Sequence, residues 1–93
     1  MSVRKAQNQV RKKYGVGKTA LHKRMSSNRM EINTLGYAAQ WPDAWAGLFG
    51  DKQRQEMHSL VDALAADSII ATAYRKAEEA ARKAMADREA EVA

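Results

Sequence analysis

The sequence predicts an all-α fold, a small helical domain with an N-terminal helix-turn-helix and a long alanine-rich C-terminal helix. Three observations support this prediction. Alanine and aliphatic residues are abundant, whereas the 93 residues include one proline. Apolar residues recur three and four positions apart along most of the chain. Glycines and the proline stand where these periodic segments begin or end.

The first helix is predicted over residues 3–14, where apolar side chains are spaced three and four apart. They are Val3, Ala6, Val10 and Tyr14. This spacing places them on one face of an α-helix. Gly15 follows at once, and glycine adopts the left-handed conformation that ends a helix without steric cost.

A second helix is predicted to start at Gly17, with Val16 packed into the corner before it. Leu21 and Met25 form its predicted buried face. The side chains predicted to be exposed are Lys18, Thr19, His22 and Lys23. Nine basic residues and no acidic residue precede Glu31. From Glu31 onward the sequence contains seven basic and eleven acidic residues. This asymmetry predicts a polyanion as the partner of the N-terminal part.

The stretch KKYGVGKTALHKRM joins a Lys-Lys-Tyr-Gly-Val turn to a Lys-Thr-x-Leu-His-Lys-Arg segment. Through it, residues 10–25 resemble the helix-turn-helix of the pipsqueak, centromere-protein-B and resolvase type. In that family the glycine makes the corner and the second helix enters the major groove. The resemblance implies groove contacts from Gly17, Lys18, Thr19, His22 and Lys23. It implies phosphate contacts from Arg11, Lys12 and Arg24.

The chain departs from that family in two ways. Arg11 stands where the family usually has a small residue facing the second helix. The family's additional preceding helix is also missing, so a downstream segment would have to supply its packing. Two alternatives remain open from the sequence: a solvated basic helix pair without a DNA role, and a non-specific RNA-binding arm.

The end of the second helix is ambiguous. The Ser-Ser-Asn sequence at 26–28 competes for backbone hydrogen bonds, so we expect a break there, with Ser27 capping a short helix. The alternative is one helix that continues to about Leu35 and ends at Gly36. We divide the chain into a basic helix-turn-helix over 1–29 and a helical core and oligomerisation or partner-binding region over 30–93, within a single structural unit.

The densest hydrophobic sequence follows. The Trp-Pro-Asp sequence at 41–43 predicts a helix start. Trp41, Trp45 and Phe49 are four residues apart and project to nearly one side. They form either part of the core or a docking surface for a partner protein. Asp51 is the predicted cap of the next helix.

The C-terminal part is rich in alanine. Asp67-Ser68 is either a polar pair inside a helix or the cap of a new one. From residue 74 to 92 we expect a helix with an alanine face inward and charged side chains outward. Its expected ion pairs are Glu78–Arg82 and Glu79–Lys83. Small side chains allow helices to approach closely, so we expect a homodimer or higher oligomer.

No catalytic or metal-binding motif is recognised. The chain has no cysteine, so it offers neither a disulfide nor a thiolate site. The Gly-Lys-Thr sequence at 17–19 is the ending of a phosphate loop, but Lys12 stands where that motif needs glycine. His22 and His58 have no partner at metal-ligand spacing. We therefore expect a protein that is not an enzyme, has no cofactor, spans no membrane and is cytoplasmic.

The sequence favours a small DNA-binding protein, a transcriptional regulator or repressor that reads duplex DNA with its second helix. One alternative is an antitoxin or phage-type inhibitor that neutralises a partner protein. Residues 27–31, Ser-Asn-Arg-Met-Glu, resemble the Ser-x-x-x-Glu stretch of antitoxins against Fic-type toxins, although Ile32 stands where that family has Gly or Asn. Another alternative is a phage DNA-packaging accessory protein.

Overall fold

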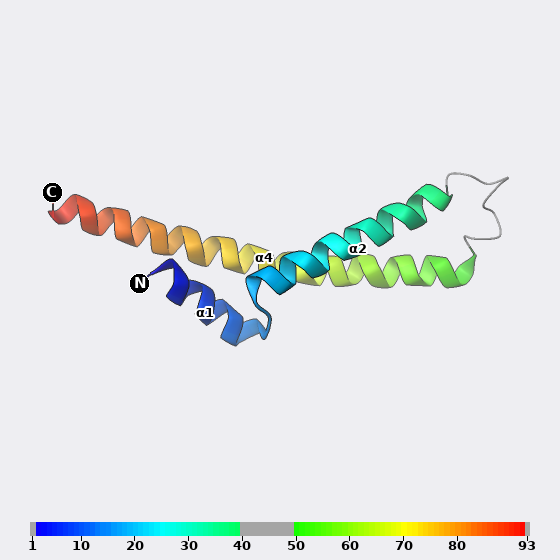
Figure 1. Cartoon of the computed structure of the whole chain (residues 1–93), viewed down its shortest axis with the longest axis horizontal. Coiled ribbons are helices and arrows are strands. Elements are labelled where there is room, and N and C mark those ends of the chain that lie inside the picture. Colours follow the sequence, from blue (N-terminus) through cyan, green and yellow to red (C-terminus); the bar gives the residue numbers. More distant parts are fainter. Residues whose placement is uncertain (1, 40–49, 93) are drawn as a thin grey trace. The chain divides into compact units, whose positions relative to one another are not determined.

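The computed structural model of this protein describes residues 2–39 and 50–92. These residues form three helices: α1 (Val3–Tyr14), α2 (Lys18–Ala39) and α4 (Asp51–Val92) (Figure 1). No strand occurs among them. The predicted all-α fold with a long C-terminal helix is confirmed. Trp41, Trp45 and Phe49, predicted to bind a partner, lie outside the described residues.

The chain divides into two compact units. One unit, which we call the terminal unit, combines Met1–His22 with Ser68–Ala93. The other, which we call the central unit, is Lys23–Asp67. These limits differ from the division at residues 29 and 30 that the sequence suggested. The first turn of α2 and the last part of α4 belong to the terminal unit, and the remainder of both helices belongs to the central unit.

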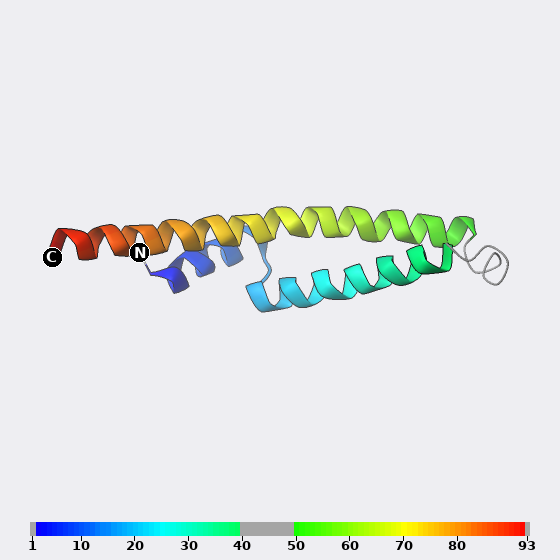
Figure 2. The same ribbon diagram turned by 90° about the horizontal axis from the view of Figure 1, so that it is seen from above.

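The terminal unit consists of α1, the first turn of α2 and the last part of α4. Two views show α1 lying alongside that part of α4 (Figures 1 and 2). The two run antiparallel, since Gln7 contacts Glu78 while Val16 contacts the earlier Tyr74. The buried apolar side chains described in this unit are Ala6, Val10, Leu21, Tyr74 and Ala81. The predicted inward faces of α1 and of the start of α2 are therefore confirmed at Ala6, Val10 and Leu21.

Helix α1 has matched signals at its two ends. The Ser2 hydroxyl oxygen accepts the backbone N–H of Lys5 at 3.2 Å, which satisfies a donor of the first turn. The last turn carries Arg11, Lys12 and Lys13, cations that the negative end of the helix dipole favours. Lys13 also places its Nζ 5.4 Å from the centroid of the Tyr14 ring.

The predicted break at 26–28 is wrong, because α2 continues through these residues and through Gly36 to Ala39. Ser27 therefore lies inside the helix and caps nothing. Met25 is buried, and Ile32 and Leu35 are half-buried. This apolar stripe outweighs the weak helix preference of Ser-Ser-Asn, because packing contributes more to helix stability than local propensity does.

Helix α4 is a single helix of 42 residues. It starts at Asp51, and Gly50 occupies the cap position, where its carbonyl oxygen accepts the Arg54 N–H and its own N–H donates to Gln53 Oε1. The predicted cap at Asp51 is therefore displaced by one residue. Asp67 and Ser68 lie inside the helix, as one of the two alternatives stated.

In the central unit, α2 lies beside the first part of α4 (Figures 1 and 2). Gly36 faces Met57, because a Cβ at position 36 would be 3.8 Å from the Met57 Cε atom. Met25 and Asp67 are the residues described as buried in this unit. Among the described residues, no helix combines the length and apolar character that crossing a membrane requires.

Candidate nucleic-acid interface

The corner between α1 and α2 depends on Gly15. Its φ of 75° and ψ of 12° place it in the left-handed region, and its N–H donates to the Arg11 carbonyl oxygen at 2.7 Å. Only glycine enters this region without a steric penalty, so the predicted end of the first helix at Gly15 is confirmed. Helix α2 starts at Lys18, and the Gly17 carbonyl oxygen accepts the Leu21 N–H at 2.9 Å. Gly17 is thus the residue immediately before the helix.

Tyr74 holds this corner from α4. Its side chain is 2% exposed, and its hydroxyl donates to the Val16 carbonyl oxygen at 2.5 Å. Leu21 is fully buried in the same unit. Helix α4 thus packs against the corner between α1 and α2. The turn is therefore fixed by a residue 58 positions away.

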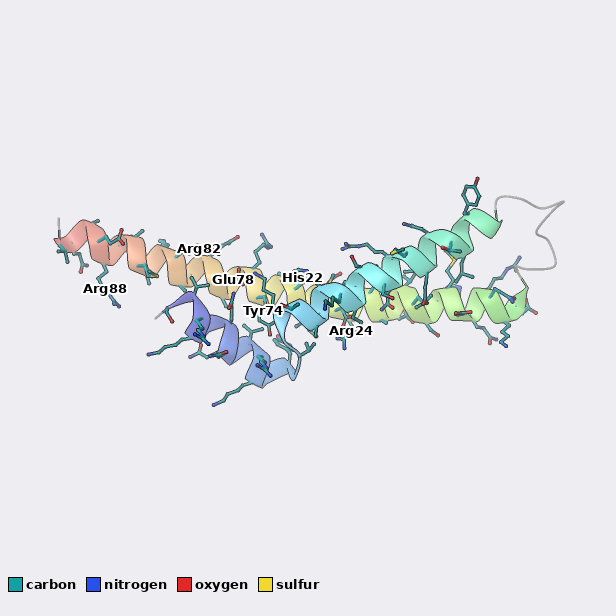
Figure 3. All side chains as sticks on the ribbon, in the orientation of Figure 1. His22, Arg24, Tyr74, Glu78, Arg82 and Arg88 are labelled. Atoms are coloured by element: carbon teal, nitrogen blue, oxygen red, sulfur yellow. The ribbon has the colours of Figure 1, made fainter. Side chains whose placement is uncertain are left out.

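Glu78, one turn beyond Tyr74, is buried and forms a polar cluster. Its Oε1 atom accepts hydrogen bonds from Lys18 Nζ at 2.5 Å and from Gln7 Nε2 at 2.9 Å. The Oε2 atom lies 3.8 Å from Arg82 Nη2. These donors, above all Lys18 and then Gln7, lower the pKa of Glu78, so the carboxylate stays ionised although it is buried. Figure 3 shows Tyr74 and Glu78 on α4, in the part of that helix that α1 lies alongside.

The interpretation of Glu78 as an outward-facing residue is therefore wrong. It pairs with Arg82 at i+4, as predicted, but only 5% of its surface is exposed. Glu79 contacts Arg75 at 3.8 Å instead of the predicted Lys83. Glu78 follows Tyr74 by four positions and precedes Ala81 by three, so it belongs to the buried stripe of α4. That spacing was visible in the sequence and could have identified it.

Two open depressions adjoin the corner and share Asn8 and Arg11. One lies at the end of α1 and is lined by Asn8, Arg11, Lys12 and Gly15. The other lies between α1 and the first turn of α2, lined by Gln7, Asn8, Arg11, Gly17, Lys18, Thr19, Ala20 and Tyr74. Arg11, Lys12 and Thr19 are exposed. Five of the predicted DNA-binding positions are thus brought together here: Arg11, Lys12, Gly17, Lys18 and Thr19.

His22 lines neither of these two depressions. It is exposed and lines a depression with Lys18, Tyr74 and Glu78. Lys18 therefore borders two depressions, but its ammonium group is directed to Glu78. The prediction that Lys18 is simply exposed needs correction, because its side chain is 40% exposed and its ammonium group pairs with the buried carboxylate of Glu78.

Lys23 and Arg24 belong to the central unit. Lys23 is exposed, as predicted. Arg24 donates from Nε and Nη2 to the two oxygens of Asp67, at 2.8 and 2.7 Å. Hydrogen bonding to this carboxylate raises the pKa of Arg24, and the Asp67 side chain is 8% exposed. The guanidinium group predicted to contact phosphate is thus already occupied by a planar, bidentate partner.

The two units differ in charge. The terminal unit contains eleven basic and five acidic residues, a formal net charge of +6. The central unit contains five basic and six acidic residues, a net charge of −1. The positive charge therefore coincides with the unit that contains the glycine corner.

Comparison of the chain with protein-family models, with curated proteins and with solved structures gives no match in any of the three. Within residues 2–39 and 50–92, no three side chains of the kinds that bind metals are grouped.

Proposed function

We propose that this protein binds duplex DNA through the exposed surface of the terminal unit at its glycine corner. One observation supports this proposal most strongly. Arg11, Lys12 and Thr19 are exposed around adjoining depressions on a corner fixed by Gly15 and Tyr74. A surface held by a core presents its cations in one arrangement, and less conformational entropy is lost when it binds.

The side chains suit separate tasks. Arg11 and Lys12, at the end of α1, provide charge for phosphate oxygens, which fix the register of a protein on the duplex. Thr19 and His22, on α2, have short side chains with hydrogen-bonding groups that fit contact with base edges. A net charge of +6 adds long-range attraction to any polyanion.

Many helix-turn-helix regulators bind as dimers to two half-sites, one for each copy of the chain. In helix-turn-helix dimers the recognition helices lie about one DNA turn apart, about 34–36 Å. We propose a homodimer that acts as a repressor at an operator with two-fold symmetry.

The decisive experiment measures fluorescence anisotropy of a labelled random-sequence duplex over a range of salt concentrations. Arg11→Gln combined with Lys12→Gln is compared with a control in which Lys83→Gln is combined with Arg88→Gln. Both variants lose two positive charges within the terminal unit, but only the first loses them at the corner. Losing two phosphate contacts lowers the log–log salt slope by about 1.8.

We expect the corner variant to lose affinity and slope, and the control to stay close to the wild type. Equal weakening of both variants would show non-specific attraction to overall charge. Tighter binding of single-stranded RNA than of duplex would instead favour an RNA-binding arm. Selection of the bound duplexes from the random pool then identifies a preferred sequence.

A second function is favoured by a separate observation in the central unit. Ser27, Met30 and Glu31 line a depression on α2, and Met30 is 69% exposed. An exposed methionine beside a carboxylate is suited to contact the surface of another protein, and an inhibitor of a partner protein must make such a contact. Retention of a larger protein through purification, lost on Met30→Glu but not on Lys52→Gln, supports this function. A protein that purifies alone and binds duplex contradicts it.

A further inference from the structure

Lys18 occupies a boundary between the proposed DNA-binding surface and the buried cluster at Glu78. It lines the depression that contains Arg11 and Thr19, and also the one that contains His22 and Glu78. Its side chain is 40% exposed, whereas that of Glu78 is 7% exposed. The lysine side chain is therefore partly open to solvent, whereas the carboxylate that holds it is buried.

Glu78 keeps hydrogen-bond partners when Lys18 is absent. Gln7 donates to the same oxygen, Oε1, at 2.9 Å. Arg82 lies 3.8 Å from the other oxygen, and its side chain is 63% exposed, so it has room to move closer. A buried carboxylate becomes costly when its last partner is removed. Release of Lys18 leaves Glu78 with both a neutral donor and a cation.

Lysine suits such an exchange. Its ammonium group is compact, carries three donors and sits on a flexible four-carbon stem. Carboxylate and phosphate oxygens offer it the same kind of acceptor. The side chain already lines both depressions, so we expect rotation of the stem to carry Nζ from one to the other.

We propose that Glu78 competes with nucleic-acid phosphate for Lys18, so that binding of DNA exchanges the carboxylate for a phosphate oxygen. This inference rests on the proposed function of the terminal unit. Glu78 is in this role a positioning residue that never touches DNA. It lowers the affinity of the free protein for polyanions and makes Lys18 available only where a phosphate replaces the carboxylate.

The test is duplex affinity of Glu78→Gln against Glu79→Gln. Each variant loses one negative charge, and the two positions are adjacent on α4, but Glu79 is exposed and pairs with Arg75. Glu78→Gln is expected to bind duplex roughly three- to tenfold more tightly than the wild type. Glu79→Gln is expected to change affinity much less. Equal effects of the two substitutions overturn the proposal.

The effect of Glu78 must also depend on Lys18. Lys18→Gln is expected to weaken binding and to lower the log–log salt slope by about 0.9, the value for one phosphate. Adding Glu78→Gln to Lys18→Gln is expected to change nothing further. A gain in affinity that persists in the double variant overturns the proposal, because it arises from net charge alone.

A third comparison avoids substitution of the buried acid and remains available if Glu78→Gln does not fold by circular dichroism. Arg82→Gln removes the cation that replaces Lys18 at Glu78, and Lys83→Gln removes an exposed cation beside it. We expect Arg82→Gln to weaken duplex binding more than Lys83→Gln does, and equal weakening overturns the exchange. A wild-type protein that binds no duplex overturns the proposed function and the exchange together, whereas duplex binding without these differences overturns the exchange alone.

Discussion

The two buried acids of α4 hold their cations in different ways. Within the described part of the chain, both hydrogen bonds that reach Asp67 come from Arg24. Glu78 shares its cluster among Lys18, Gln7 and Arg82. The first arrangement is a closed pair, and the second has spare donors. We therefore expect Lys18 to be more available to another anion than Arg24 is.

The largest effect is expected at Tyr74, which lies one turn before Glu78 on α4 and fixes the corner. Tyr74→Ala is expected to lower the free energy of unfolding by about 3–5 kcal/mol, because a large buried side chain is lost. Tyr74→Phe, which removes only the hydrogen bond to Val16, is expected to cost about 1 kcal/mol. Urea denaturation followed by circular dichroism measures both. Met25→Ala in the central unit is the reference, and a smaller loss for Tyr74→Ala than for Met25→Ala would contradict this account.

The difference between the pairs is tested by removing each cation. Lys18→Met is expected to lower the free energy of unfolding by about 1 kcal/mol or less, because Glu78 retains two donors. Arg24→Met is expected to lower it more, because it leaves Asp67 buried without its bidentate partner. Both substitutions replace a cation by an apolar side chain of similar length, so urea midpoints are directly comparable. Equal losses, or a larger loss for Lys18→Met, would refute the distinction.

The smallest effect concerns pH. The pKa of Glu78 lies below its ordinary value of 4.5 in the folded protein, so the folded state favours the ionised form. Its stabilising contribution is fully present above about pH 4.5 and is lost as pH falls through the lowered pKa. This contribution amounts to about 1.4 kcal/mol for each unit of lowering.

Unfolding curves between neutral pH and about pH 3 therefore separate Glu78→Gln from Glu79→Gln. The wild type and Glu79→Gln are expected to lose stability as the pH falls, and Glu78→Gln to lose less. Equal pH dependence of all three proteins would show that the Glu78 cluster is not formed in solution.

Local signals predicted the fold well where one residue type has one physical role. Gly15 ends α1 because its backbone needs a positive φ, and the spacing of Leu21 and Met25 predicted two buried residues. The predicted break at Ser27 failed because the local preference is weak and tertiary packing decides. The spacing of apolar residues there was compatible with a break and with a continuous helix, and only packing against α4 decides between them.

The candidate site was predictable in part for the same reason. Exposed Arg11 and Lys12 follow from the pattern of α1 alone. The ion pairs of Lys18 and Arg24 join residues 60 and 43 positions apart, and charge composition does not specify such pairings. A charged residue on an apolar stripe, as at Glu78 and Asp67, is the signal that such a pairing exists. It does not identify the partner.

The hydrogen bond between Tyr74 and Val16 has a consequence for synthesis in the cell. Translation proceeds from the N-terminus, so α1 and its basic corner leave the ribosome long before Tyr74 and Glu78 do. Until then the corner lacks the side chains that fix it, and a nascent chain carries the cations without their final arrangement. The corner therefore gains its fixed arrangement only late in the production of the polypeptide.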